Sequence, residues 1–327
     1  MNEVFTLHWD HGRAEVQTLG GMLGPAYFKL GAREVQPFAI MPWGEDSGAS
    51  HAALPGILQR TRGEWPCVPF GAPTAPEGLP KHWQPPKPQP VCPDFHGYSA
   101  NNHWEVLERS ETALRLGITY PDNHPIERLE REVFGVSGQS ALQCRLHITA
   151  RADVTLPIAL HPCFALSSAP QKTEIVADFE FGKTLPFQAE KGVSRLLPDV
   201  DFAELGTISR LPLPYATEEI VQLCGAKGPI ALLNHEAGYR VDLKYDQALF
   251  PSVLLWVSNR GRSEYPWLSR FEGVGIEPLC GAFDLGSDVS NWAENPIAKR
   301  GVATAISLKA GQTITTKYGF RISALVS

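Results

Sequence analysis

The sequence predicts an all-β fold, a large antiparallel β-sandwich, on two observations. Most of its periodic segments alternate apolar and polar residues with a period of two, which is typical of half-buried strands. Clusters of Gly, Pro, Asn and Asp separate these short segments, and the chain contains 29 Gly and 28 Pro. Long amphipathic helices are missing from the pattern, so we expect a sandwich rather than βαβ units.

The predicted strands follow one another along most of the chain. In order, they are Val4–Trp9, Arg13–Leu19, Trp104–Arg109, Ala113–Tyr120, Ile126–Val136, Ala141–Ala150, Leu156–Leu166, Ile230–Leu233, Tyr239–Tyr245, Val253–Ser258, Val302–Leu308 and Thr313–Ser323. Between Ser287 and Lys299 the pattern favours one or two helical turns. No internal repeat of 20 to 50 residues is present. We expect residues 1–327 to form a single domain.

A proline-rich segment, Ala72–Pro93, interrupts this organisation. It includes Trp83 and the pair Pro85-Pro86, and its proline content excludes a central strand. Long loops of this kind are lids or binding loops in some proteins and surface loops in polyproline conformation in others. The sequence leaves both alternatives open for the loop at about 72–93.

Composition and charge exclude several classes of function. The 327 residues carry a net charge of −6 with a pI near 5.9, whereas nucleic-acid binding requires a basic face. No Lys or Arg run suggests a membrane patch, and no apolar run approaches the roughly 20 residues of a membrane helix. The N-terminal residues lack the basic start of an export signal. We therefore expect a cytoplasmic protein that binds a small molecule and neither nucleic acid nor membrane.

The six cysteines are scattered singly and form no CxxC motif. In a long chain without an export signal, reduced thiols are expected rather than disulfides. They are Cys67, Cys92, Cys144, Cys163, Cys224 and Cys280.

Two titratable residues far apart in the chain each precede a proline within an apolar stretch. These are His161 in Leu160-His161-Pro162 and Glu277 in Ile276-Glu277-Pro278. A following proline disfavours helical backbone, so both residues are expected in extended segments. A general acid and a general base held on strands can perform proton transfer. A hydrogen-bonded structural histidine is the alternative interpretation of His161.

The alternation of side chains along a strand predicts the surroundings of both residues. His161 shares its face with Ala159 and Cys163, and Glu277 shares its face with Gly273 and Gly275. Small neighbours on these faces leave space for a ligand. A carboxylate in an apolar strand is costly to bury without a partner, which makes Glu277 a candidate site residue.

Four ordered motifs include these residues. Residues 62–71 read Arg-Gly-Glu-Trp-Pro-Cys-Val-Pro-Phe-Gly, and residues 95–105 read Phe-His-Gly-Tyr-Ser-Ala-Asn-Asn-His-Trp-Glu. His161-Pro162-Cys163-Phe164 and the strand with Glu277 follow. In this order they resemble the aldose 1-epimerase (galactose mutarotase-like) superfamily, nearest the glucose-6-phosphate 1-epimerase branch. The resemblance covers roughly Gly56 to Leu285.

The resemblance implies a β-supersandwich and an isomerase that opens a sugar ring at its anomeric carbon. Glu277 matches the family's catalytic base, His161 its general acid, and His96 a second histidine at the ring. Arg62 matches an arginine that lines the pocket. No metal or redox cofactor is implied, and we expect a monomer or homodimer.

Two further residues are candidates because sugar sites favour planar polar groups and aromatic platforms. Asn102 follows the His-Gly motif, and Trp256 is a candidate platform or a core residue. Trp65, Tyr98 and Trp104 are further candidates for an aromatic platform, with a place in the core as the alternative.

The chain also departs from the family pattern. Ala100 stands where the sugar-phosphate branch has an arginine, the residue suited to bidentate phosphate binding, so we expect an unphosphorylated sugar. Cys163 replaces an aromatic residue of the family's motif. The pocket aspartate of many members has no clear counterpart, and Asp201 and Asp246 are weak candidates for it.

Several alternatives remain open at this point. One is a non-catalytic carbohydrate-binding domain of the same fold. Another is an epimerase of hexose 6-phosphates or of a sugar acid. A third is a metal enzyme built on His96, His103, His161 and Glu277, although these residues lack local ligand spacing.

Overall fold

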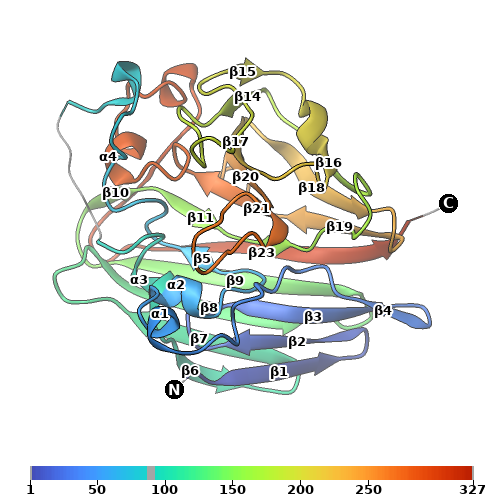
Figure 1. Cartoon of the computed structure of the whole chain (residues 1–327). Helices are drawn as coiled ribbons and strands as arrows, with labels where there is room; N and C mark the ends of the chain where they lie inside the picture. Colours follow the sequence, from blue (N-terminus) through green and yellow to red (C-terminus); the bar gives the residue numbers. More distant parts are fainter. Residues whose placement is uncertain (1, 87–92, 326–327) are drawn as a thin grey trace.

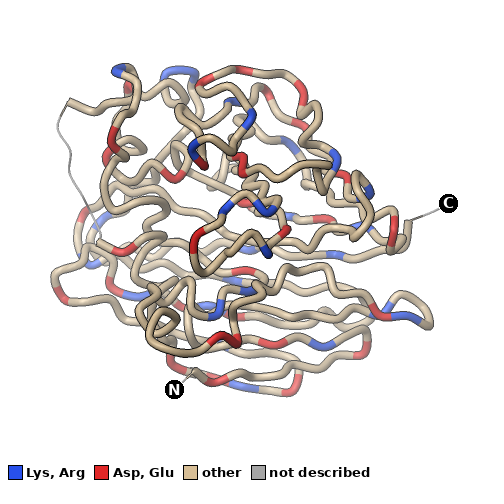
Figure 2. Tube along the Cα trace, in the orientation of Figure 1, with Lys and Arg blue, Asp and Glu red and all other residues tan. Residues whose placement is uncertain are grey.

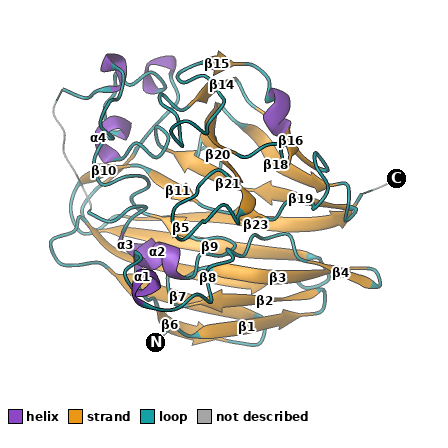
Figure 3. Ribbon diagram, in the orientation of Figure 1, coloured by secondary structure: helices purple, strands orange, loops and turns teal. Residues whose placement is uncertain are grey.

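The computed structural model describes residues 2–86 and 93–325, and strands dominate it (Figure 3). Neighbouring strands within each of the described sheets run antiparallel, as predicted. The largest sheet has nine strands, in the order β16 (Arg210–Leu211), β13 (Thr173–Asp178), β18 (Lys227–Asn234), β19 (Tyr239–Lys244), β23 (Thr313–Ala324), β9 (Ala141–Ala150), β8 (Ile126–Gly135), β7 (Ala113–Thr119) and β6 (Glu105–Arg109).

Two smaller sheets cover the inner face of the nine-stranded sheet (Figure 1). One has four strands, β1 (Val4–Trp9), β2 (Gly12–Gln17), β3 (Leu23–Leu30) and β4 (Arg33–Val35). The other has the order β15 (Asp201–Phe202), β14 (Phe181–Thr184), β17 (Thr217–Cys224), β20 (Ser252–Asn259), β21 (Glu272–Cys280), β11 (Ile158–Leu160) and β5 (Pro66–Cys67), and β12 (Cys163–Phe164) also pairs with β21. A two-stranded sheet joins β10 (Val154–Leu156) to β22 (Ile306–Leu308).

The layers enclose one large apolar core and a second cluster beyond it. The core between the sheets includes Phe28, Leu146, Leu255 and Ile276, all nearly inaccessible. The second cluster lies on the outer face of the eight-stranded sheet, under loops and short helices. The short helices are α1 (Ala49–Ala52), α2 (Gly56–Gln59), η1 (Lys81–Trp83), α3 (Tyr98–Asn101), η2 (Gly206–Ser209), α4 (Ser287–Ser290) and η3 (Ala298–Arg300). Of these, η2 instead contributes Ile208 to the core between the sheets.

The fold class agrees with the sequence prediction, and so do several elements. The segments Val4–Trp9 and Ala141–Ala150 are strands with the predicted bounds, and helical turns lie between Ser287 and Lys299. The prediction of one strand over Leu156–Leu166 was wrong. Prolines at 157 and 162 cannot donate to a ladder, and the segment divides into β10, β11 and β12.

Other strands were not predicted because their sequences do not alternate apolar and polar residues with a period of two. β17 is buried along its whole length although it contains two glutamates and a glutamine. β3 contains Gly24-Pro25, which reads as a loop signal. The strand predicted over Val302–Leu308 begins only at Ile306.

A buried ion pair crosses between the sheets. The Arg131 guanidinium in β8 donates to the Glu64 carboxylate, which also accepts a hydrogen bond from the Tyr318 hydroxyl at 2.9 Å. Both charged side chains are completely buried. A buried charge is tolerated only when its partners are in place, so this cluster fixes the segment that leads from Glu64 into β5.

The proline-rich segment forms a loop in its described part, residues 72–86 and 93, while residues 87–92, including Cys92, lie outside the described residues. Trp83 is fully buried, and its indole nitrogen donates to Asp199 at 3.1 Å. His82 and Lys183 pair with the same carboxylate at 2.6 and 2.8 Å. Asp199 therefore fastens this loop to the segment that precedes β15.

Surface features agree with the composition. Positive and negative side chains are interspersed along the chain (Figure 2). The five described cysteines are buried free thiols, as predicted. Within the described residues, no helix is long and apolar enough to cross a bilayer.

Candidate active site

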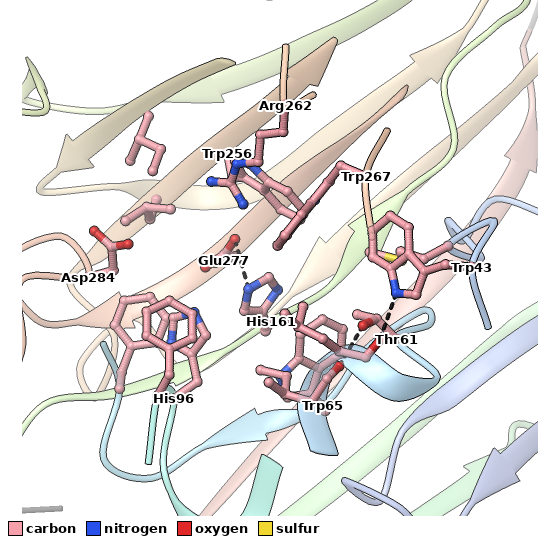
Figure 4. A pocket seen from close by; sticks show the side chains of 17 residues that line it. Trp43, Thr61, Trp65, His96, His161, Trp256, Arg262, Trp267, Glu277 and Asp284 are labelled. Atoms are coloured by element: carbon pink, nitrogen blue, oxygen red, sulfur yellow. Dashed lines mark hydrogen bonds and ion pairs between the residues drawn. The ribbon is translucent and has the colours of Figure 1, made fainter. Parts of the chain in front are cut away.

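A cavity lies on the outer face of the eight-stranded sheet, where β11, β20 and β21 are covered by loops (Figure 4). It encloses about 640 Å³, including its open mouth. Its lining is mostly apolar and aromatic, with a few titratable groups: Met41, Trp43, Ile57, Leu58, Thr61, Trp65, Phe70, Phe95, His96, His161, Ile220, Leu254, Trp256, Arg262, Trp267, Glu277 and Asp284. A concave apolar site with a few convergent polar groups is typical of small-molecule binding.

Glu277 lies on the cavity face of β21. Val274 and Ile276 point into the core between the sheets, so the alternation predicted for this strand is correct. The Glu277 side chain is 1% exposed, and neither carboxyl oxygen has a hydrogen-bond partner among the described residues. An unsatisfied buried carboxyl is costly and marks a site for a ligand.

His161 lies opposite Glu277, in the link between β11 and β12. Its Nε2 is 3.4 Å from Oε1 of Glu277. Its ring stacks on the Trp65 indole with centroids 4.2 Å apart, and its backbone N–H donates to the Trp65 carbonyl at 2.9 Å. Its Nδ1 is 3.4 Å from Sγ of Cys163. These contacts hold Nε2 toward the carboxyl group.

Burial shifts both titratable groups toward their neutral forms. It raises the pKa of Glu277 well above 4.5, and the nearby Asp284 carboxyl raises it further. It lowers the pKa of His161 to about 3. These shifts favour a protonated carboxyl and a neutral imidazole, so the two groups share one titratable proton.

His96 reaches the cavity from a strained turn. Its φ of 58° is in the left-handed region, and the next residue is Gly97, where a Cβ would lie 2.4 Å from the Val68 carbonyl. The Gly71 backbone N–H donates to Nδ1 of His96 at 3.2 Å. Because burial holds the pKa of His96 well below 6.5, its ring is neutral and its proton is on Nε2. The ring lies 5.2 Å from that of His161.

Trp256 lines the cavity beside a polar group that the sequence did not reveal. Its indole nitrogen donates to Oε1 of Glu218 in β17 at 2.5 Å. The same oxygen lies 3.1 Å from Nε of Arg262. Oε2 of Glu218 accepts from the Ser258 hydroxyl at 3.0 Å.

Asp284 and Arg262 are two ionisable groups of the cavity lining that the sequence did not indicate. Asp284 follows Phe283, whose φ of 48° is unusual for a bulky residue, and the Asp284 carbonyl accepts from Ala72 at 2.8 Å. A methyl group on Gly71 would meet the Asp284 backbone at 2.9 Å. Loop residues carry no periodic signal, so only the tertiary packing reveals them.

The structure does not bring every candidate to the cavity. Arg62 is buried beside Glu15, at 3.6 Å, and is outside the cavity lining. The Asn102 amide donates to the Tyr98 carbonyl at the end of α3. Ala100 is fully buried in the same helix.

The remaining candidates also lie elsewhere. Asp201 pairs with Lys183 and Arg300, and Asp246 accepts from backbone amides in its own turn, so neither is a cavity aspartate. His103 contacts Thr18, away from the other proposed metal ligands. The described residues contain no group of three or more His, Cys, Asp or Glu placed to hold a metal ion.

Comparisons with known proteins support the fold. No family model and no curated protein matches the chain. Among solved structures, it resembles a protein from Escherichia coli K12 provisionally assigned as an aldose 1-epimerase, with a TM-score of 0.70, 17% identity and coverage of 99% of this chain and 100% of the other. The aldose epimerase homologue from C. elegans has a TM-score of 0.65 at 12% identity and full coverage of both chains.

A third structure, a galactose mutarotase-like protein from Lactobacillus casei, has a TM-score of 0.61 at 14% identity and covers 98% of this chain and 100% of its own. The chain therefore has the galactose mutarotase-like β-sandwich fold. At these identities the likeness establishes the fold, and activity has to be argued from the site.

Proposed function

We propose that the protein interconverts the anomers of an uncharged sugar by opening and reclosing the ring, as an aldose 1-epimerase-like isomerase. One observation carries this proposal. Nε2 of His161 lies 3.4 Å from a buried Glu277 carboxyl that has no hydrogen-bond partner among the described residues, in a cavity lined by aromatic rings. A facing acid and base in an apolar cavity suit proton transfer to and from a bound sugar.

The proton held by this pair is sufficient for both roles. Transfer of the Glu277 proton to Nε2 of His161 produces a carboxylate base and an imidazolium acid without a proton from solvent. A bound sugar favours this form, because its hydroxyl groups solvate the separated charges. Burial therefore couples formation of the charged pair to sugar binding, since the apolar cavity stabilises neither charge before the sugar is bound.

The proposed reaction balances through this pair. Glu277 takes the proton of the anomeric hydroxyl while His161 gives its proton to the ring oxygen. The bond between C1 and the ring oxygen breaks, and an open-chain aldehyde forms. After rotation about C1–C2, the proton transfers run in reverse and the ring closes as the other anomer. Each positioned group is worth roughly 10²- to 10⁴-fold in rate.

His96 and the indole rings have supporting roles in this proposal. The proton on Nε2 of His96 is available to a sugar oxygen, because Nδ1 already accepts from Gly71. Trp256 offers a flat apolar surface to the C–H face of a sugar ring, whereas Trp65 supports the His161 ring that stacks on it.

Anomer exchange measured by NMR would test the proposal. The panel contains free sugars, sugar acids and sugar 6-phosphates, and the variants are Glu277→Gln and His161→Asn. Glu272→Gln, at the start of the same strand and paired with Arg260 at 2.9 Å, is the matched control. We expect exchange of free sugars with the wild type and the control, and its loss in both site variants.

Three other results would contradict the proposal. Anomer exchange at the wild-type rate in Glu277→Gln or His161→Asn would show that the substituted residue is not the proposed base or acid. Binding of sugars without acceleration of exchange would identify a carbohydrate-binding protein. Accelerated anomer exchange of sugar phosphates or sugar acids, without exchange of free sugars, would show that the substrate is charged.

A further inference from the structure

The loop between β20 and β21 brings a fixed arginine to the cavity. Arg262 is half-buried in this loop, with its guanidinium carbon 5.5 Å from the ring centroid of Trp256 and 4.8 Å from that of Trp267. Its Nε lies 3.1 Å from Oε1 of Glu218. Two indole rings, both labelled in Figure 4, and the Glu218 carboxylate therefore restrict the side chain on several sides.

The carboxylate that holds Arg262 is closed to a ligand by its neighbours and its burial. Oε1 of Glu218 already takes the Trp256 indole and Nε of Arg262, and Oε2 takes the Ser258 hydroxyl. The Glu218 side chain is fully buried. It can orient Arg262, but a sugar cannot reach it.

The free part of the guanidinium faces the cavity. Among the described residues, none accepts a hydrogen bond from the two terminal nitrogens of Arg262. The indole nitrogen of Trp267 is buried without an acceptor among the described residues. The unpaired terminal nitrogens of Arg262 and this buried donor at one wall indicate a ligand that brings oxygen atoms.

The charges around the cavity indicate whether the ligand's oxygen atoms belong to anionic groups or to hydroxyl groups. Arg262 is the single Lys or Arg among the described lining residues, and Glu218 balances its charge. The two carboxyls of the lining, Glu277 and Asp284, have pKa values that burial raises. An anionic substituent would have to leave water for a cavity with no unbalanced cation, whereas hydroxyl groups can accept from the fork without burying a charge.

We propose that Arg262 is the specificity-determining residue, which donates from its two terminal nitrogens to adjacent hydroxyl groups of an uncharged aldose, and that Glu218 is its positioning residue. This proposal rests on the function proposed above. It adds that the enzyme discriminates against sugar acids and sugar phosphates, and that the wall formed by Arg262 binds hydroxyl groups remote from the ring oxygen that His161 addresses.

The first experiment compares Arg262→Met and Arg262→Lys with the matched control Arg260→Met, which removes an arginine that pairs with Glu272 outside the cavity. We expect kcat/KM for the best free sugar to fall about 10- to 100-fold in Arg262→Met, mainly through KM. Lysine keeps the charge without the fork, so Arg262→Lys is expected to lose at least about 10-fold. Circular dichroism and Tm report whether each variant is folded.

Deoxy sugars distinguish a direct contact from a structural effect. For the wild type, kcat/KM should fall on the sugar that lacks the contacted hydroxyl group by about as much as it falls on the parent sugar in Arg262→Met. Arg262→Met should then lose nothing further on that deoxy sugar. Equal loss in Arg262→Met on the parent sugar and on every monodeoxy sugar would overturn the contact.

A double-mutant cycle tests the role of Glu218. Glu218→Gln should raise KM, and the double variant with Arg262→Met should be no worse than Arg262→Met alone, because Glu218 acts through Arg262. Additive losses would overturn the positioning role.

Direct binding measured by ligand NMR separates the two proposals. If the wild type binds free sugars but exchanges none, weaker binding to Arg262→Met still supports the arginine contact while the proposed isomerase fails. Tighter binding of sugar acids or phosphates than of free sugars, abolished in Arg262→Met, would make Arg262 an anion anchor and overturn the inference. Unchanged binding and exchange in Arg262→Met would also overturn it.

Discussion

Gly275 and Glu277 point to the same side of β21, and a methyl group on Gly275 would lie 2.3 Å from Oε1 of Glu277. The carboxyl group occupies the space that a side chain at Gly275 would fill. Because Gly275 has no Cβ, the Glu277 carboxyl can lie in this space, opposite His161.

This relationship predicts the effect of Gly275→Ala. The added methyl group must displace the Glu277 carboxyl, so we expect kcat to fall by about 100-fold or more while the strand remains paired. Gly117→Ala, in β7, is the control, because its Cβ would meet only the ends of two flexible side chains, Arg128 and Leu107, outside the cavity. A Gly275→Ala enzyme with wild-type kcat would show that the carboxyl position is not critical.

Glu277 should also make the folded protein sensitive to alkaline pH. Its raised pKa means that the folded protein keeps a proton that the unfolded chain releases above about pH 4.5. The free energy of unfolding therefore falls as the pH rises through this range. Glu277→Gln removes the titrating carboxyl and with it this loss of stability at higher pH. We therefore expect its Tm to be similar to the wild type near pH 4 and higher by about 2 °C or more at pH 8.

Thermal unfolding followed by circular dichroism from pH 4 to pH 8 measures this difference. Glu272→Gln, which changes a carboxyl at the start of the same strand, should show no such crossover. A Glu277→Gln protein that is less stable than the wild type at pH 8 would contradict the predicted burial cost.

His161 should have the opposite effect at acidic pH. Its pKa is lowered to about 3 in the folded protein, so below about pH 6.5 the unfolded chain gains a proton that the folded state does not. The free energy of unfolding then falls with pH, by about 2 kcal/mol at pH 5. His161→Asn should lose less stability than the wild type between pH 7 and pH 5.

Denaturant unfolding at these two pH values measures the effect. His8→Asn, which replaces an exposed histidine in β1, is the control and should behave like the wild type. An equal loss of stability in His161→Asn and the wild type would contradict the prediction.

Asp199 should control the proline-rich loop. Asp199→Gly removes the acceptor of Trp83 and the partner of His82, and glycine tolerates the φ of 60° at this position. We expect faster amide exchange around Lys81–Trp83, by about 10-fold or more, and faster tryptic cleavage after Lys81.

Hydrogen exchange with mass spectrometry would measure this loosening. Asp201→Ala is the control, because Asp201 pairs with Lys183 and Arg300 but not with the loop. Unchanged exchange in Asp199→Gly would show that other contacts hold the loop. Altered sugar binding in the same variant would support a lid, and unaltered binding a surface loop.

The strand pattern predicted the faces of the two candidate strands well. Ile158, Leu160 and Phe164 enter the core between the sheets, while Ala159 and Cys163 face the outer cluster, as the alternation around His161 required. The period of two reports which face of a sheet is buried, and this property is local to the strand.

The pattern failed where other forces determined the structure. β17 carries Glu218 on its cavity side, beside Trp256, and its glutamates concealed the period of a fully buried strand. Arg62 was expected in the pocket but lies against Glu15, and Arg262 occupies the cavity wall instead. The two arginines are chemically identical, so only their packing distinguishes them.

By itself, the sequence determined the all-β class, the faces of β11, β12 and β21, and the presence of His161 and Glu277 on one side of them. These follow from the backbone period and from proline, which act over a few residues. The resemblance indicated His96, but tertiary structure alone decided that Asp284 and Arg262 meet this pair, and that Arg262 lies against Glu218. These groups come from segments up to 188 residues apart, from His96 to Asp284, and only chain-wide packing brings such segments into contact.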